Sequence, residues 1–187
     1  MISEAHRRLR DATRADHDRL EHRVDILRRI AEPQARRRLV EGFYGLHRDA
    51  ETAMAPWLAD LPDLDFAARR RSAVLAGDLA AADGRAPDVE PVELAGRPEA
   101  LGLMYVLEGS TLGGQVIRRE AARTGVTMTG LGFLDPYGAE TGPRWRAFLA
   151  VVDAWAAGED DIVSLIAGAR RGFALAEARL CGVPAVG

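Results

Sequence analysis

Apolar residues recur along most of the chain at the three- and four-residue spacing of helices that bury one face. This pattern predicts six helical segments and no strand. The expected helices cover residues 3–30, 33–58, 66–82, 98–125, 144–157 and 160–180. Pro33 and Pro98 suit a first helical turn, and Gly125 suits a helix stop. We therefore expect an all-α protein, a single-domain irregular helical bundle spanning residues 1–187.

The longest irregular stretch between the expected helices covers residues 125–143. Loops of this length inside a compact domain are usually functional or disordered. Leu131, Phe133 and Tyr137 give this loop apolar surface that can be buried. We therefore expect a packed loop.

Composition and charge exclude several functional classes. The 187 residues carry a formal charge of -3, without the basic field of a nucleic-acid-binding protein. The arginines at 36–38 and 69–71 have many acidic neighbours, and we interpret both triplets as solvated helix faces. No apolar run is long enough to span a bilayer, and the N-terminus lacks the apolar segment of a signal peptide. We expect a cytoplasmic protein that binds neither nucleic acid nor membrane.

Two residue types restrict the chemistry. Cys181 is the single cysteine, which excludes an internal disulfide and a CxxC metal site. The chain contains no lysine, which excludes a Schiff-base lysine, a pyridoxal-phosphate enzyme and a Walker A phosphate loop. The reaction must use other groups.

One histidine lies on the apolar face of the first expected helix. His17 precedes Leu20 by three residues and Val24 by seven, so it shares their side. Glu21, one turn later, is placed to accept a hydrogen bond from the imidazole, an arrangement that fixes the tautomer of a metal-binding histidine. A plain surface pair between these two residues is the alternative interpretation.

Two arginines lie on the same flank of this helix. Arg10 and Arg14 precede His17 by seven and three residues. A histidine flanked by cations suits a planar, iron-bearing ligand with carboxylate arms. No second histidine occurs at ligand spacing, so iron bound by His17 would take its equatorial ligands from a macrocycle.

Three glycines interrupt a helical pattern in the segment YVLEGSTLGGQVI, residues 105–117. Gly109 and Gly113 are four residues apart and share one face, and Gly114 widens the bare strip. An interior glycine costs roughly 0.5–1 kcal/mol relative to alanine, so three cost about 2–3 kcal/mol. Either a neighbouring helix packs closely on this strip, or a flat ligand lies against the backbone. Mid-helix glycines also permit a kink over such a ligand.

The two motifs together resemble the haem oxygenase family. ATRADHDRLE, residues 12–21, is followed about 90 residues later by YVLEGSTLGGQVI in an all-helical chain. The EGSTLGG form and the loop FLDPYGAETGPRWRAF, residues 133–148, are similar to the bacterial branch, which includes members that make biliverdin for bacteriophytochromes. The resemblance spans almost the whole chain.

The resemblance implies a reaction, its partners and a set of site residues. The reaction is the oxygen-dependent cleavage of haem to biliverdin, carbon monoxide and ferrous iron, with haem as both substrate and cofactor. A ferredoxin or reductase would supply electrons, and a bacteriophytochrome is a candidate recipient of the biliverdin. By motif match, His17 would be the axial iron ligand and Glu21 its hydrogen-bonding partner. Gly109, Ser110 and Gly113 would form the catalytic segment of a kinked distal helix.

The same match assigns further contacts to the haem. Arg10 and Arg14 fall where relatives place propionate-binding bases, and Arg170 matches another such base. Gly114 would border the haem on the distal helix, and Phe173 would be a pocket wall.

One position departs from the common family pattern. Many members carry an aspartate directly after the glycine that matches Gly109, where it orders distal water. This chain has Ser110 there, as the bacterial branch commonly does. The water network would then be built from backbone carbonyls, Ser110 or ordered waters.

Two other functions compete with catalysis. A haem-binding carrier or sensor could use the same fold without turnover, although a carrier has no need to bend a helix over the iron. A relative with the wider haem-oxygenase-like fold could hold another small molecule in the central cavity.

Overall fold

The computed structural model describes residues 3–182, and within them the chain forms α-helices and short 3-10 helices but no strand. The α-helices are α1 (Glu4–Val24), α2 (Ile26–Ala31), α3 (Pro33–Leu58), α4 (Ser72–Ala81), α5 (Arg97–Arg123), α6 (Thr141–Trp155) and α7 (Glu159–Cys181). The 3-10 helices are η1 (Ala67–Arg69), η2 (Gly132–Leu134) and η3 (Gly138–Glu140). The predicted all-α class is confirmed.

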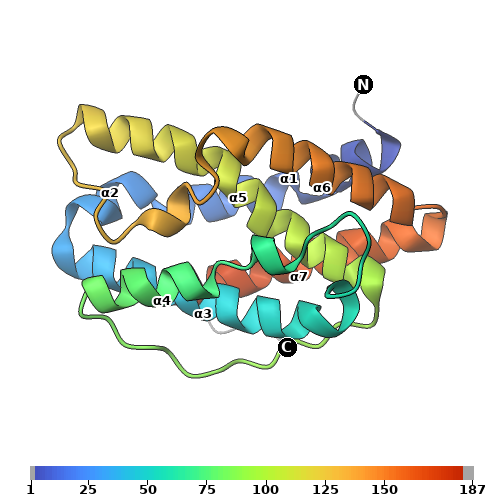
Figure 1. Ribbon diagram of the computed structural model, residues 1–187, viewed down its shortest axis with the longest axis horizontal. Helices are drawn as coiled ribbons and strands as arrows, with labels where there is room; N and C mark the ends of the chain where they lie inside the picture. Colours follow the sequence, from blue (N-terminus) through green and yellow to red (C-terminus); the bar gives the residue numbers. More distant parts are fainter. Residues whose placement is uncertain (1–2, 183–187) are drawn as a thin grey trace.

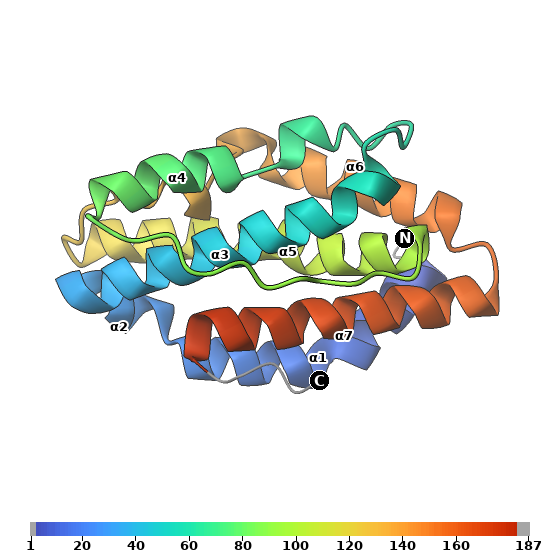
Figure 2. The ribbon, with the colours of Figure 1, turned by 90° about the horizontal axis from the view of Figure 1, so that it is seen from below.

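Helix α5 crosses the middle of the bundle (Figure 1), and its most extensive packing is against α7. Helix α1 lies along another side of α7, and α3 contacts α4, α5 and α7. Figure 2 shows α1 and α7 side by side at one edge of the molecule and α4 at the opposite edge. Because α1 and α5 both pack on α7 but share few direct contacts, α7 forms a floor between them.

Two glycines allow α5 and α7 to approach closely. A Cβ at Gly102 of α5 would collide with the carbonyl of Leu165, and one at Gly168 of α7 would collide with the backbone of Glu99. Close helix packing of this kind was one of the two explanations for the glycines at 109, 113 and 114. In α5 it occurs at Gly102, about two turns before Gly109.

The first helix is shorter than predicted. We expected one helix over residues 3–30, but it is interrupted at Asp25, whose backbone is left-handed with φ 44° and ψ 57°. Aspartate tolerates this conformation better than most residues, and its N–H still bonds to the carbonyl of Glu21 at 3.3 Å. No glycine or proline in the sequence signals the break.

The third expected helix begins later than predicted. Instead of a helix from residue 66, the chain forms η1, passes through an extended Arg70 and enters α4 only at Ser72. Glu51 of α3 accepts hydrogen bonds from the backbone N–H groups of Arg71 at 2.6 Å and Ser72 at 3.1 Å. The start of α4 is therefore capped by a carboxylate about twenty residues away, which no local pattern reveals.

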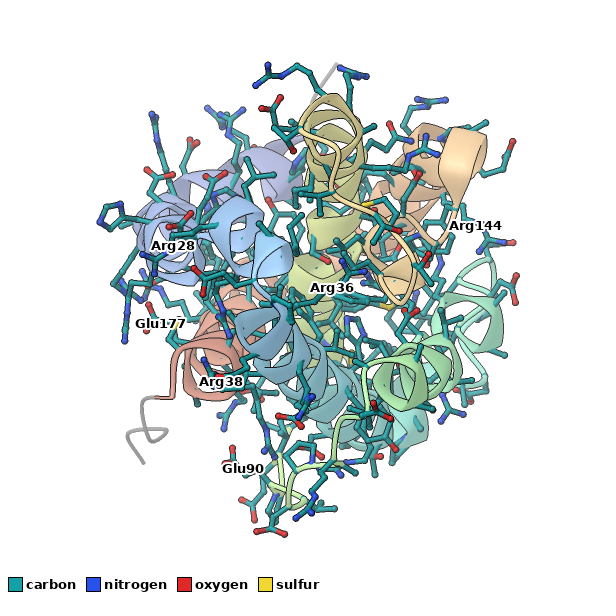
Figure 3. The ribbon with its side chains drawn as sticks, turned by 90° about the vertical axis from the view of Figure 1, so that its left-hand side faces the viewer. Arg28, Arg36, Arg38, Glu90, Arg144 and Glu177 are labelled. Atoms are coloured by element: carbon teal, nitrogen blue, oxygen red, sulfur yellow. The ribbon has the colours of Figure 1, made fainter. Side chains whose placement is uncertain are left out.

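The loop between α5 and α6 is packed, as expected. Leu131 and Phe133 are buried, and the Phe133 N–H donates to the Asp78 carboxylate at 3.0 Å. Arg36 of α3 reaches toward this loop and donates to the carbonyl of Thr127 at 2.8 Å (Figure 3). None of the described helices combines the length and apolar character needed to cross a membrane.

Candidate functional site

Helices α1 and α5 run in the same direction and touch at one end (Figure 1). There, the ring of His6 meets those of Tyr105 at 6.1 Å and Trp145 at 5.9 Å, measured between centroids. Three helical turns further along each helix, about 16 Å away, His17 and Val116 are both exposed. Both side chains are uncovered at this end, whereas the two helices meet at His6. We interpret the space between α1 and α5, from His6 to His17, as the candidate site and call it the slot.

His17 stands on the α1 side of the slot. Its side chain is 62% exposed, and its ring meets that of Phe173 edge-on with centroids 6.2 Å apart. Phe173 is buried on α7, so it forms the apolar floor beneath the imidazole. The structure therefore brings together two residues that the sequence placed about 150 positions apart.

Two carboxylates lie near the imidazole, and neither is within hydrogen-bond distance. His17 Nδ1 is 3.9 Å from Glu21 Oε2 and 3.6 Å from Asp18 Oδ1. Glu21 is at the expected place one turn after His17, and Asp18 competes with it for the same nitrogen. Either carboxylate can orient the ring by a small side-chain rotation.

The three arginines assigned to the site lie in two different places. Arg10 and Arg14 are exposed on the His17 flank of α1, where they face Asp11 at 2.9 Å and Asp18 at 3.9 Å. Arg170 instead donates to the carbonyl of Ala12 at 3.4 Å. Ala12 is five residues from His17, which is about 140° around the helix. Arg10 and Arg14 thus share the His17 flank of α1, whereas Arg170 contacts α1 at Ala12.

The glycines of α5 differ in what surrounds them. At Gly113 an added Cβ would have no atom within 4 Å, and at Gly109 it would meet only the Trp145 ring at 3.8 Å. At Gly114 it would collide with the carbonyl of Leu134. Gly109 and Gly113 thus leave open backbone on the slot side. Gly114 does not belong to this strip, because close packing of the α5–α6 loop explains its missing side chain.

Ser110 lies beside the open strip and is held by an arginine. Its hydroxyl donates to the Leu107 carbonyl at 2.7 Å and accepts from Arg71 Nη1 at 3.3 Å, while Arg71 Nη2 also donates to the Leu107 carbonyl. Arg71 is only 3% exposed, and Arg69 is buried as well. Our interpretation of residues 69–71 as a solvated face is therefore wrong for two of the three arginines.

Side-chain bonds to the backbone accompany a bend in α5. Ser110 bonds to the carbonyl three residues before it, and the Thr111 hydroxyl does the same to Glu108 at 2.7 Å. Such back-bonding and the added donation from Arg71 weaken the regular ladder and bend a helix. The two halves of α5 run in visibly different directions (Figure 1).

A buried polar cluster lies behind Ser110. His47 Nε2 and Arg71 Nε are buried without a protein hydrogen-bond partner, and His47 Nδ1 has only the Glu51 carboxylate nearby, at 3.4 Å. Burial, reinforced by the charge of Arg71, lowers the pKa of His47 to about 4, so the ring is neutral at pH 7. Buried polar atoms without protein partners are places where ordered water is retained. The cluster is thus suited to hold water between α3 and the distal side of the slot.

Sequence reasoning missed Arg71, His47 and Tyr105. Tyr105 is four residues before Gly109 and so shares its helix face, which is the signal that could have identified it. It is half-buried between His6 and Trp145, and burial raises the pKa of its hydroxyl. Arg71 and His47 gave no such signal, because their position depends on how α3 and α4 pack against α5.

These residues fit a haem. The slot offers an exposed imidazole, an apolar floor and a side-chain-free stretch of backbone at Gly113, and the cations of Arg10 and Arg14 suit carboxylate arms. The described residues contain no group of three or more histidine, cysteine or carboxylate side chains that could hold a metal ion.

A hollow of about 490 Å³ lies elsewhere, on the flank of α5 next to the α5–α6 loop. It is lined by Gln115, Arg118, Arg119, Ala122, Gly138 and Ala139. None of these residues is a metal ligand of the kind that haem requires. The slot is therefore the better candidate site.

Comparisons with known proteins agree with this class of helical protein. The family model for heme oxygenase matches residues 3–179, and the chain belongs to the heme oxygenase family. Its fold is similar to that of the heme oxygenase from Neisseria meningitidis, solved bound to NO and CO, with a TM-score of 0.81 and 23% sequence identity over 97% of this chain and 94% of that one. No curated protein matches the sequence. Family membership assigns the protein to haem binding and degradation.

Proposed function

We propose that the protein is a biliverdin-forming haem oxygenase, which cleaves haem with oxygen and electrons to biliverdin, carbon monoxide and ferrous iron. The observation that carries this proposal is the pairing of an exposed imidazole on α1 with open backbone on α5. The His17 side chain is 62% exposed, and a Cβ at Gly113 would have no atom within 4 Å, so both are accessible to a ligand held between the two helices. Haem, as substrate and cofactor, supplies the iron and the oxygen chemistry when it is bound.

The α1 side of the slot would hold and orient the haem. His17 would be the iron ligand, with Glu21 orienting its other nitrogen and Phe173 packing beneath the ring. Arg10 and Arg14 would bind the propionates, because guanidinium groups pair with carboxylates in two-point hydrogen bonds.

The α5 side of the slot would exclude bulk water and hold protons. Gly109 and Gly113 would let the α5 backbone approach a bound haem closely, because neither carries a side chain and no backbone packs against them. In place of an aspartate, Ser110 offers a hydroxyl whose orientation is fixed by Arg71 and the Leu107 carbonyl. Water retained near His47 would supply the protons that this hydroxyl passes on.

The proposed reaction needs partners. Haem cleavage consumes electrons, so a ferredoxin or reductase is the expected donor. A bacteriophytochrome is a candidate acceptor of the biliverdin, on the strength of the motif resemblance alone.

A hemin titration followed by turnover tests the proposal. The protein should give a Soret band on binding hemin and should convert the complex to a bile pigment with oxygen and a reductant. A complex that forms but yields no tetrapyrrole product would instead identify a carrier or sensor. Weak hemin binding that is insensitive to His17→Ala would favour another ligand in the same fold.

A further inference from the structure

The loop of residues 124–140 has no part in the function described so far, although it runs along the back of the distal helix. The Leu134 carbonyl packs against Gly114, and the Gln115 side-chain amide donates to the Gly138 carbonyl at 2.6 Å. The Tyr137 hydroxyl reaches the segment next to Gly109 by donating to Glu108. The loop is therefore fixed to the part of α5 that carries the open strip.

Glu108 is the point at which this loop meets the interior. The side chain is buried, and its two oxygens are bonded by different segments of the chain. Oε1 accepts from the Tyr137 hydroxyl at 2.8 Å, and Oε2 accepts from Arg69 Nη1 at 2.6 Å. A buried carboxylate with both oxygens bonded is held in one position, and the loss of either donor leaves it undersatisfied.

Arg69 and Tyr137 are themselves held by α6. Both terminal nitrogens of Arg69 donate to the Arg144 carbonyl, at 3.3 and 3.2 Å. The Arg144 guanidinium lies over the Tyr137 ring, 4.8 Å from its centroid, on the outer side of the molecule (Figure 3). The phenol is thereby kept between a surface cation and a buried carboxylate.

Glu108 also lies next to Arg71 in the structure, because Arg71 Nη2 donates to the carbonyl of Leu107, the residue directly before Glu108. Burial lowers the pKa of Arg71, and the negative charge of Glu108 is the largest influence in the opposite direction. Glu108 thus helps to keep Arg71 cationic inside the protein. Arg71 in turn donates to Ser110, the hydroxyl proposed for the distal proton path.

We propose that Tyr137 is a positioning residue for the oxygen-binding side of the haem, acting through Glu108 and Arg71 on Ser110. The inference rests on the proposed function, because it assigns a task to the distal side of the same slot. Tyr137 does not contact the haem slot. Its hydroxyl fixes the carboxylate that compensates Arg71, and Arg71 fixes the Ser110 hydroxyl.

The test compares Tyr137→Phe with wild type in the full-length protein loaded with hemin. The phenol is lost while the ring, which packs under Arg144, is kept. We expect the hemin dissociation constant to stay within twofold, while product formation per electron consumed falls about five- to tenfold and released peroxide rises. Tyr44→Phe, on α3 and remote from Glu108, is the matched control and should match wild type.

A second variant separates electrostatic positioning from loosened packing. Glu108→Gln keeps the shape but removes the charge that compensates Arg71. We expect the pH midpoint of the visible absorption change of the hemin complex to fall by at least half a pH unit, because uncompensated positive charge favours the deprotonated form of a nearby titrating group. If Glu108→Gln only loosened the packing around residue 108, there would be no reason for the pH midpoint to fall rather than rise.

The outcomes distinguish this inference from the proposed function. If wild-type protein makes no bile pigment, the proposed function fails. If wild type makes it and Tyr137→Phe keeps the same ratio of product to peroxide, the positioning role is overturned. It is also overturned if Tyr137→Phe lowers hemin affinity and melting temperature in proportion to turnover, since that result marks a structural role. Should Glu108→Gln fail to fold, the Tyr137→Phe comparison decides alone.

Discussion

The imidazole of His17 meets the ring of Phe173 edge-on, with centroids 6.2 Å apart, although the two residues come from opposite ends of the chain. Phe173 is buried in the hydrophobic core, whereas His17 is exposed. An edge-on aromatic contact restricts the imidazole without occupying its nitrogens. The ring is thus held in place and still free to bind a metal.

Replacement of His17 tests this arrangement directly. His17→Ala should weaken hemin binding at least tenfold and abolish the Soret signature of histidine-ligated haem, because no other described histidine borders the open end of the slot. Thermal unfolding of the haem-free protein should change little, since the side chain is exposed. His22→Ala is the matched control, being exposed on the same helix but about 140° away from His17.

The adjacent glycines of α5 should respond in opposite ways to the same substitution. Gly113→Ala should stabilise the haem-free protein by about 0.5–1 kcal/mol, because its Cβ meets open space and helix propensity rises. Gly114→Ala should destabilise it, because its Cβ collides with the Leu134 carbonyl. Chemical denaturation of both variants measures the difference. Equal destabilisation by the two would contradict the open strip.

A larger side chain at the open position separates stability from function. Gly113→Leu should fold as well as wild type and lose hemin binding or turnover, because the side chain would enter the slot. The measurement is a hemin titration beside a melting curve. An intact haem complex with full turnover would show that the ring plane lies elsewhere.

The glycine pair also shows how far the sequence can predict this site. Periodicity placed Gly109 and Gly113 on one face of a helix, and neither has backbone packed against it, because helix geometry is local. It placed His17 on the apolar face of α1, but that side chain is 62% exposed, at the edge of the buried stripe. It could not separate Gly113 from Gly114, since the atom that occupies the space at Gly114 belongs to a loop twenty residues later. Local patterns also missed the break at Asp25, where a left-handed aspartate replaces the usual glycine.

The buried arginines show a second limit to what can be predicted from the sequence. A run of three arginines is most often solvated, yet Arg69 and Arg71 are buried because Glu108 and backbone carbonyls from three segments receive their donors. Such compensation depends on the packing of helices far apart in sequence. The distal half of the candidate site was therefore less predictable than the half on α1.

A small substitution at Ser110 tests the hydrogen bonds that join Ser110, Arg71 and the Leu107 carbonyl. Ser110→Ala removes one acceptor of Arg71 and keeps the other, the Leu107 carbonyl. We expect hemin binding within twofold of wild type and about a three- to tenfold loss of turnover, which is less than the roughly hundredfold or greater contribution of a general acid. Thr124→Ala, at the far end of the helix, is the control. A variant with unchanged turnover at every pH would remove Ser110 from the proton path.

The buried His47 makes stability depend on pH in a defined window. Burial, aided by the charge of Arg71 and partly opposed by Glu51, lowers its pKa to about 4, against about 6.5 in the unfolded chain. Between these values the unfolded state binds a proton that the folded state does not, so the free energy of unfolding should decrease as pH falls from about 6.5 to about 4.

A shift of this size corresponds to roughly 3 kcal/mol. His47→Gln, which cannot titrate, should remove that part of the pH dependence while leaving the contribution of His6, whose pKa burial also lowers. Urea denaturation of both proteins at pH 7, 5.5 and 4 measures the difference. If the two free-energy curves stay parallel across this window, His47 is not the buried neutral group that the structure describes.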